Sequence, residues 1–167
     1  MANVLITRLV GFAVILAVFV VAVGAYTRLA DAGLGCPDWP GCYGFLTVPE
    51  AVADVSLAEA RYPDAPVEVT KAWWEMGHRY IAGALLLLVF AIFVVAWRGR
   101  QENTPTTFMS VLLVIILCQA AFGAWTVTLK LWPQVVTAHL LGGFTTLSLL
   151  WLVLLRQGVF PSIHRGL

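Results

Sequence analysis

Two histidines and one carboxylate stand close to where apolar runs of the sequence begin. Glu75 and His78 come just before the apolar run 80–97, and His139 lies near the start of the run 135–155. On a helix, Glu75 and His78 are three residues apart and share one face. Because ionisable groups are costly at membrane depth, they indicate a functional site there by default. Which chemistry they could perform depends on whether the two histidines meet.

The composition is that of a membrane protein. Of the 167 residues, 60% are hydrophobic and only 11% are charged, whereas soluble domains have about 45–50% apolar and about 25% charged residues. The net charge of +1 comes without a basic block, so no nucleic-acid partner is expected. Four apolar stretches reach the length of about 20 residues that a spanning helix needs.

These stretches predict one all-α membrane domain, residues 1–167, built as an antiparallel bundle of four transmembrane helices in the lipid bilayer. The predicted spans are 9–27, 73–97, 106–128 and 134–155, and a structured external loop covers 28–72. The first stretch taken alone also fits a signal peptide, although its apolar run is long for one. Short helical pieces are expected in the loop at 49–53 and 56–61.

Arginines mark one side of the predicted bundle. They are Arg8, Arg98, Arg100, Arg156 and Arg165. Cytoplasmic loops carry an excess of Lys and Arg, so both termini are expected in the cytoplasm and the acidic loop on the outer side.

Cys36 and Cys42 bracket a short turn rich in Pro and Gly within the external loop. A disulfide persists outside the cytoplasm, so we expect one between them, with Cys118 unpaired in a span. The bridge could hold a lid over the outer mouth of the bundle. It could also react with a redox partner as a thiol pair, or act only as a structural staple.

A short repeat predicts that the histidines lie at one depth. Residues 24–27, Gly-Ala-Tyr-Thr, resemble residues 123–126, Gly-Ala-Trp-Thr, and a glycine-containing pair follows each histidine. His78 and His139 each lie a few residues past a membrane interface, on helices that run in the same direction. At about 1.5 Å per residue, both are about 6–8 Å inside the bundle. Two neutral imidazoles at one depth can hold a single metal.

The surroundings of the histidines favour haem over zinc. A structural zinc needs four ligands, whereas apolar residues, glycines and aromatics suit a flat cofactor with axial histidines between facing helices. The alternative for each histidine is a polar group that bonds a neighbouring helix, and Gln119 is expected to make such a bond. Glu75 could accept a proton or stabilise a cation, or it could only orient His78 or pair with Arg79.

Four motifs in order resemble the haem A synthase family, which includes the mitochondrial cytochrome oxidase assembly proteins. They are Tyr-Thr-Arg-Leu at 26–29, Gly-Leu-Gly-Cys-Pro-Asp-Trp-Pro at 33–40, Glu-Met-Gly-His-Arg at 75–79 and the stretch 126–140. The resemblance covers essentially the whole chain. It implies a haem-dependent oxidoreductase that converts haem O to haem A, by oxidising a ring methyl to a formyl group, for use in terminal oxidases.

The resemblance also implies roles for individual residues. His78 and His139 match the histidine pair that holds the substrate haem iron, and Glu75 matches an essential glutamate, which makes it the expected catalytic residue. Cys36 and Cys42 match a cysteine pair found in the external loop of some members.

Arg28 and Arg79 are expected to bind haem propionates, because guanidinium pairs well with carboxylate, unless each is only an interface anchor.

Family members usually have eight spans in two halves, and the carboxy-terminal half carries a haem b cofactor. The matched motifs belong to the amino-terminal half, so we expect catalysis to need a second half, from a homodimer or a partner.

Haem O synthase and terminal oxidase subunits are further expected partners, and the bacterial inner membrane is the expected location.

Two other functions remain open at this point, a non-catalytic haem-binding assembly protein and a small b-type cytochrome. Glu75 favours the synthase over the cytochrome, because electron transfer alone does not need it.

Overall fold

The computed structural model describes residues 2–99 and 106–157, and its regular elements there are five helices. They are α1 (Ala2–Leu29), α2 (Val52–Arg61), α3 (Val69–Gly99), α4 (Thr106–Thr128) and α5 (Pro133–Arg156). All except α2 are long and apolar enough to cross a membrane. The predicted class, an all-α membrane protein with four spanning helices, is therefore confirmed. Arg100 and Arg165, which contributed to the predicted orientation, lie outside the described residues.

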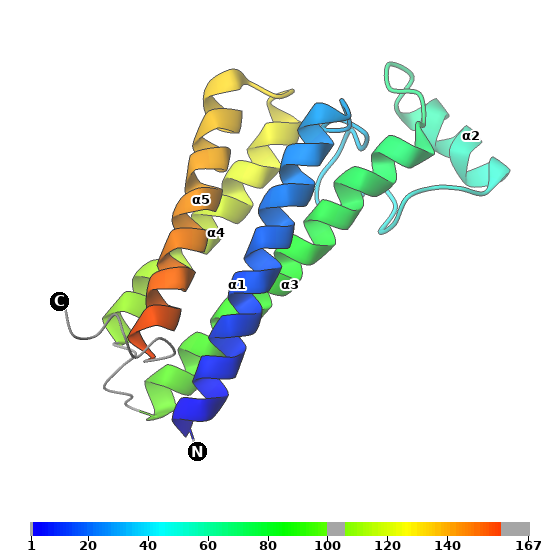
Figure 1. The fold of residues 1–167 in the computed structure, drawn as a ribbon. Helices are drawn as coiled ribbons and strands as arrows, with labels where there is room; N and C mark the ends of the chain where they lie inside the picture. The colour runs from blue at the N-terminus through cyan, green and yellow to red at the C-terminus, as the bar shows by residue number, and fades with distance from the viewer. Residues whose placement is uncertain (1, 100–105, 158–167) are drawn as a thin grey trace.

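The four long helices form a ring of neighbours. α1 contacts α3 and α5, and α4 contacts the same two helices. α1 and α4 are therefore diagonal partners, as are α3 and α5. Figure 1 shows these helices side by side, with α2 set apart at one end of the bundle.

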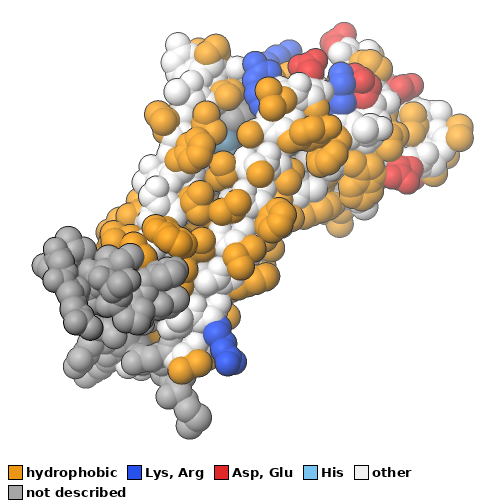
Figure 2. Space-filling view, in the orientation of Figure 1, with side chains coloured by type: hydrophobic (Ala, Val, Ile, Leu, Met, Phe, Trp, Pro, Cys, Tyr) orange, Lys and Arg blue, Asp and Glu red, His pale blue; other side chains and the backbone are white. Residues whose placement is uncertain are grey.

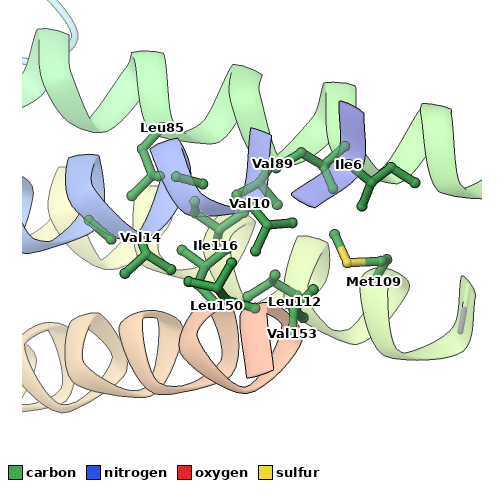
Figure 3. Close-up of a cluster of buried hydrophobic side chains, with 14 of the residues drawn as sticks. Ile6, Val10, Val14, Leu85, Val89, Met109, Leu112, Ile116, Leu150 and Val153 are labelled. Carbon is green, nitrogen blue, oxygen red and sulfur yellow. The ribbon is translucent and has the colours of Figure 1, made fainter. Parts of the chain in front are cut away.

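An apolar core fills the half of the bundle near the start of α1 and the end of α3. We call this the inner core; Figure 3 shows most of it. Its buried members are Ile6, Val10, Ala13, Val14, Ala17, Leu85, Val89, Ile92, Ala96, Met109, Leu112, Ile116, Leu150, Val153 and Leu154. Since lipid is as apolar as these side chains, helix association here depends on close packing, which the alanines allow.

A second, smaller core lies at the other end, where the external loop packs on the first turns of α3. This outer core consists of Cys36, Cys42, Tyr43, Val48, Ala58, Ala72 and Met76. Of the two short helical pieces expected in the loop, 56–61 is helical as part of α2, whereas the piece expected at 49–53 is wrong, because the helix begins only at Val52, after an extended Ala51. Val48 is buried in the outer core instead, and this packing prevails over the local preference for a helix from Pro49.

α1 and α4 end with the same hydrogen-bonded motif. In both, a residue with positive φ follows the helix, and the N–H of the next residue reaches the carbonyl of a threonine in the last turns. The residues are Asp31, Ala32 and Thr27 after α1, and Lys130, Leu131 and Thr126 after α4. The two N···O distances are 2.9 and 2.8 Å. This is a Schellman motif, and it extends the short repeat seen in the sequence.

Candidate functional site

His78 of α3 and His139 of α5 meet inside the bundle, although their helices are diagonal partners. The two ring centroids are 6.5 Å apart and the ring planes are nearly perpendicular, at 89°. Both Nδ1 atoms are buried and have no hydrogen-bond partner. The structure thus brings together the two histidines that the sequence had placed at one depth.

A glycine on the neighbouring helix makes room for each imidazole. A Cβ atom at Gly24 of α1 would lie 2.8 Å from Cε1 of His78, and a Cβ atom at Gly123 of α4 would lie 3.4 Å from Cε1 of His139. The first distance is too short for any real Cβ atom, and the second is tight. The repeat found in the sequence therefore has a structural meaning that sequence reasoning missed, because its glycines seat the two rings.

The backbone one turn inward from each glycine touches the same ring. The backbone of Val20 lies near the His78 ring, and the backbone of Gln119 lies near the His139 ring. Val20 and Gln119 each come four residues before the glycine. The helix pairs α1–α3 and α4–α5 therefore hold their histidines by equivalent contacts.

The histidines lie in a layer of the bundle in which no residue is fully buried. No residue is buried at 18–26, 77–84, 117–126 or 136–145, although buried residues precede and follow each range. We call these four ranges the histidine layer; its side chains remain partly accessible in the chain by itself. A histidine side chain is visible in a hollow between α1 and α5 (Figure 2).

Gln119 places its side chain on α5 within the histidine layer. A Cβ atom at Gly142 would coincide with the Gln119 carboxamide, with Nε2 as the nearest atom. No hydrogen bond of the described residues involves this carboxamide. The expected bond from Gln119 across the bundle is therefore absent among the described residues, and its polar end faces a glycine instead.

Glu75 and Arg79 fasten the external loop to α3. Glu75 is only 5% exposed; its Oε2 accepts a hydrogen bond from the Cys36 N–H at 2.9 Å, and its Oε1 pairs with Arg79 Nη2. Arg79 Nη1 also donates to the Gly41 carbonyl at 2.5 Å. Cys36 and Cys42 form a disulfide, as expected. Both charged side chains therefore hold the disulfide loop, residues 36–42, over the outer end of α3.

The remaining predicted residues lie at the edge of this arrangement. Arg28 is exposed in the last turn of α1, one turn outward from Gly24. Cys118 is a free, exposed cysteine on α4, which agrees with its expected unpaired state. Sequence reasoning did not assign Gln119 or the glycines beside the two rings to the site. The glycines were visible as part of the repeat, and Gln119 was visible as a polar residue within a span.

Comparison with known proteins points to one family. Residues 7–163 match the family model described as cytochrome oxidase assembly protein. The chain is 48% identical over 151 residues to a haem A synthase of Shewanella oneidensis, which covers 90% of this chain and 45% of that protein. It is 29% identical over 157 residues to a haem A synthase of Geobacillus thermodenitrificans, and this match covers 92% of this chain and 44% of that protein.

A protohaem IX farnesyltransferase of Natronomonas pharaonis is 32% identical over 108 residues, which cover 65% of this chain and 19% of that protein. No solved structure matches the chain significantly. The chain spans less than half of the length of the two synthases that it matches.

Proposed function

Because the chain belongs to the family of cytochrome oxidase assembly proteins, we propose that it acts in haem A biosynthesis as a haem A synthase-like oxidoreductase. Its substrate is haem O and its product is haem A, in which a ring methyl has become a formyl group. Relatives named haem A synthase support this proposal. Since the chain spans less than half of them, we assign the activity to the chain together with a second half, from a second copy or a partner, that carries haem b.

The observation that carries the proposal is the pair of buried, unpartnered Nδ1 atoms on His78 and His139. A buried polar atom without a partner is costly unless a ligand satisfies it, and a neutral imidazole is a good ligand for haem iron. Two axial nitrogens on one iron are about 4 Å apart, at about 2 Å per bond. A centroid separation of 6.5 Å is compatible with this distance, because each nitrogen lies on the edge of its ring.

The donor set fits a porphyrin better than a bare ion. Within the described residues, no group of three or more His, Cys, Asp or Glu side chains could hold a metal, so the histidine pair offers two ligands. A porphyrin brings its own four nitrogens and leaves two axial positions for histidines. The partial exposure of the histidine layer supports the same proposal, because a flat ligand there would cover side chains that the chain by itself leaves accessible.

We propose that Glu75 accepts a proton, or stabilises positive charge, while the ring methyl is oxidised. Its position about one turn outward from His78 on the same helix face supports this role. Its oxygens already bind the Cys36 N–H and Arg79, and a carboxylate has further lone pairs that can accept a proton. Arg79 and the exposed Arg28 are the proposed partners of the haem propionates.

We further propose that both termini lie in the cytoplasm of a bacterium and that the spans cross its inner membrane. Arg8, Arg98 and Arg156 belong to one end of the bundle, and on the face shown in Figure 2 the acidic side chains gather at the other end. The arginines at the first end support this orientation, and Lys and Arg side chains also lie beside the acidic ones at the other end. The names of the relatives support haem O synthase as the supplier and terminal oxidase subunits as the recipients of the haem.

The test is pigment analysis of membranes that contain the chain together with a source of haem O. We expect a low-spin haem spectrum in the purified protein, and we expect haem A to accumulate when the second half is present. His78→Ala and His139→Ala should each abolish the low-spin spectrum. Cys118→Ala, at the exposed cysteine of α4, is the matched control and should leave the spectrum unchanged.

Different outcomes separate the alternatives. A low-spin spectrum that survives both histidine substitutions would refute the shared haem site. Bound haem that is never converted, even with the second half present, would favour a non-catalytic assembly protein or a b-type cytochrome. Cross-linking in native membranes, with haem stoichiometry measured on the same sample, tests whether a second copy supplies the second half, and a strictly monomeric chain that makes haem A would overturn that requirement.

A further inference from the structure

We propose that residues 45–50 of the external loop, which we call the anchor segment, attach that loop to the lipid bilayer. The Leu46 side chain inserts into the leaflet beside α3, so the partner of this surface is lipid. The inference goes beyond the proposed function and does not depend on it, because it concerns the outside of the bundle and requires no haem.

The first argument is the course of the anchor segment along α3. Tyr80 Oη donates a hydrogen bond to the Leu46 carbonyl at 2.9 Å, and Trp73 Nε1 donates one to Glu50 Oε1. The two contacts are seven residues apart on α3, or about 10 Å of helix. They are four residues apart in the loop, which reach about 13 Å when extended. The anchor segment therefore runs outward along α3 from Leu46 to Glu50.

The second argument is the face of α3 on which the anchor segment lies. A stripe of exposed side chains at helical spacing begins with Trp73 and Tyr80. It continues inward with Ala84, Leu87 and Ala91, which are also exposed. Since α3 is long and apolar enough to span a membrane, this stripe faces lipid. Figure 1 shows the segment that leads into α2 on the side of α3 that faces away from α1.

The third argument is the depth of Leu46. Tyr80 comes two residues after His78 on α3, and helical side chains lean toward the amino-terminal end of their helix, which is the outer end here. The Leu46 carbonyl that Tyr80 binds therefore lies within about one helical turn of His78 along the axis. Because sequence spacing places His78 about 6–8 Å inside the bundle, Leu46 lies at the depth where lipid headgroups meet acyl chains.

The composition of the anchor segment suits this depth. The Leu46 side chain is 87% exposed in the chain by itself. No residue from 39 to 49 is charged, although eight of the nine Asp and Glu residues of the chain lie at 31–75. The first charge after this uncharged stretch is Glu50, at the outward end of the anchor segment. Covering an exposed leucine with lipid instead of water is favourable.

The backbone at the inward end of the anchor segment has protein partners. The Phe45 N–H donates to the Cys42 carbonyl at 3.0 Å, and the Cys42 N–H donates to the Phe45 carbonyl at 2.9 Å. The Leu46 carbonyl is bound by Tyr80. Backbone groups at membrane depth need such partners, because water is scarce there. The pairing with Cys42 also joins the anchor segment to the disulfide loop, so insertion of Leu46 would help to hold that loop on α3.

The test measures the depth of residue 46 in the full chain in lipid nanodiscs. In a Cys118→Ala background, Leu46→Cys carries a nitroxide label, attached without reductant so that the disulfide stays closed. The label's accessibility to oxygen, which concentrates in lipid, is compared with its accessibility to a water-soluble nickel chelate. We expect it to favour oxygen, as should Leu87→Cys, the lipid reference on the stripe of α3. Asp64→Cys, at an exposed position between α2 and α3, is the aqueous reference and should favour the nickel chelate.

A second variant tests whether insertion holds the loop in place. Leu46→Ser should accelerate hydrogen exchange in residues 36–42 by about ten-fold or more, the effect of losing the burial of one leucine side chain. Exchange in α4 and α5 should not change. The matched control is Leu57→Ser, at an exposed leucine of α2, which should leave exchange in residues 36–42 unchanged.

A label at residue 46 that favours the nickel chelate would place the anchor segment in water, and a label that neither reagent reaches would show that protein covers it. Either result overturns the inference, as does unchanged exchange at 36–42 in Leu46→Ser. None of these readouts uses haem, so a failure of the haem proposal and a failure of this inference are distinguishable.

Discussion

The helix pairs α1–α3 and α4–α5 hold a histidine in the same way but differ in how their outer ends are closed. In each pair the ring lies on a glycine of the partner helix, Gly24 or Gly123. The segment 129–132 connects α4 to α5, whereas α1 and α3 are separated by the long segment 30–68, which contains α2 and the disulfide. The comparison teaches that helix packing alone places the histidines, and that the long segment serves another purpose.

That purpose is visible in the side chains that only α3 has. Aligning His78 with His139 places Val136 opposite Glu75 and Leu140 opposite Arg79. The pair α4–α5 thus has apolar residues where α3 has the ion pair that binds the disulfide loop. The charges belong to the covering loop, and they are not needed to position an imidazole.

The largest predicted effect comes from making α3 resemble α5 at one position. Glu75→Val leaves the Arg79 guanidinium, whose side chain is only 12% exposed, without its counter-charge. Breaking such a buried pair typically costs about 3–5 kcal/mol. We expect a loss of this order in the free energy of unfolding, measured by denaturant titration in detergent.

The double variant Glu75→Val with Arg79→Leu removes both charges and is the control. It should recover much of the lost stability, because replacing a whole buried ion pair by apolar residues is often close to neutral. A double variant as unstable as the single one would mean that the apolar arrangement of α5 cannot be transferred to α3.

An intermediate effect is expected from the glycines, where the two pairs differ in tightness. In Gly24→Ala the new Cβ atom would lie 2.8 Å from His78, so the ring must move, and overpacking costs about 1–3 kcal/mol. In Gly123→Ala the distance to His139 is 3.4 Å, and the better helix propensity of Ala, about 0.5–1 kcal/mol, offsets the strain. Unfolding free energies and low-spin haem spectra of both variants should show the larger loss for Gly24→Ala. Equal losses would contradict the idea that His78 is packed more tightly against its glycine than His139.

The smallest effect on the bundle is expected from removing the disulfide, which only one pair has. Cys36→Ser with Cys42→Ser opens a short loop, for which chain entropy predicts a cost of about 2 kcal/mol. Because the inner core does not involve this loop, the cost should appear as local opening. Hydrogen exchange should therefore accelerate in residues 33–48 and at the start of α3, with α4–α5 as the internal control. Uniform acceleration across all helices would show that the loop supports the whole bundle.

Much of the fold could be predicted, because the signals that define it are local. Apolar runs of sufficient length predict spanning helices wherever they occur, and the two loop cysteines predicted their disulfide. The start of α2 could not be predicted in this way. Val48 is held by the outer core, and contacts of that kind depend on segments that are distant in the sequence.

For the candidate site, the sequence predicted which residues take part but not which groups they contact. Sequence spacing placed His78 and His139 at one depth and left Glu75 with several alternatives. The structure shows that Glu75 pairs with Arg79 and also accepts a bond from the Cys36 N–H, 39 residues away. No periodicity in the sequence indicates this second partner, because it is a backbone group that folding of the loop brings to α3.

By itself, then, the sequence determined the four spanning helices, the depth of the histidines and the chemistry available at that depth, since each depends only on side-chain type and on position along one helix. Only the tertiary structure decided that diagonal helices bring the two rings together, that glycines seat them and that Gln119 lies over Gly142. The physical reason is that these features arise from packing between helices, which depends on which faces meet and how closely their backbones approach.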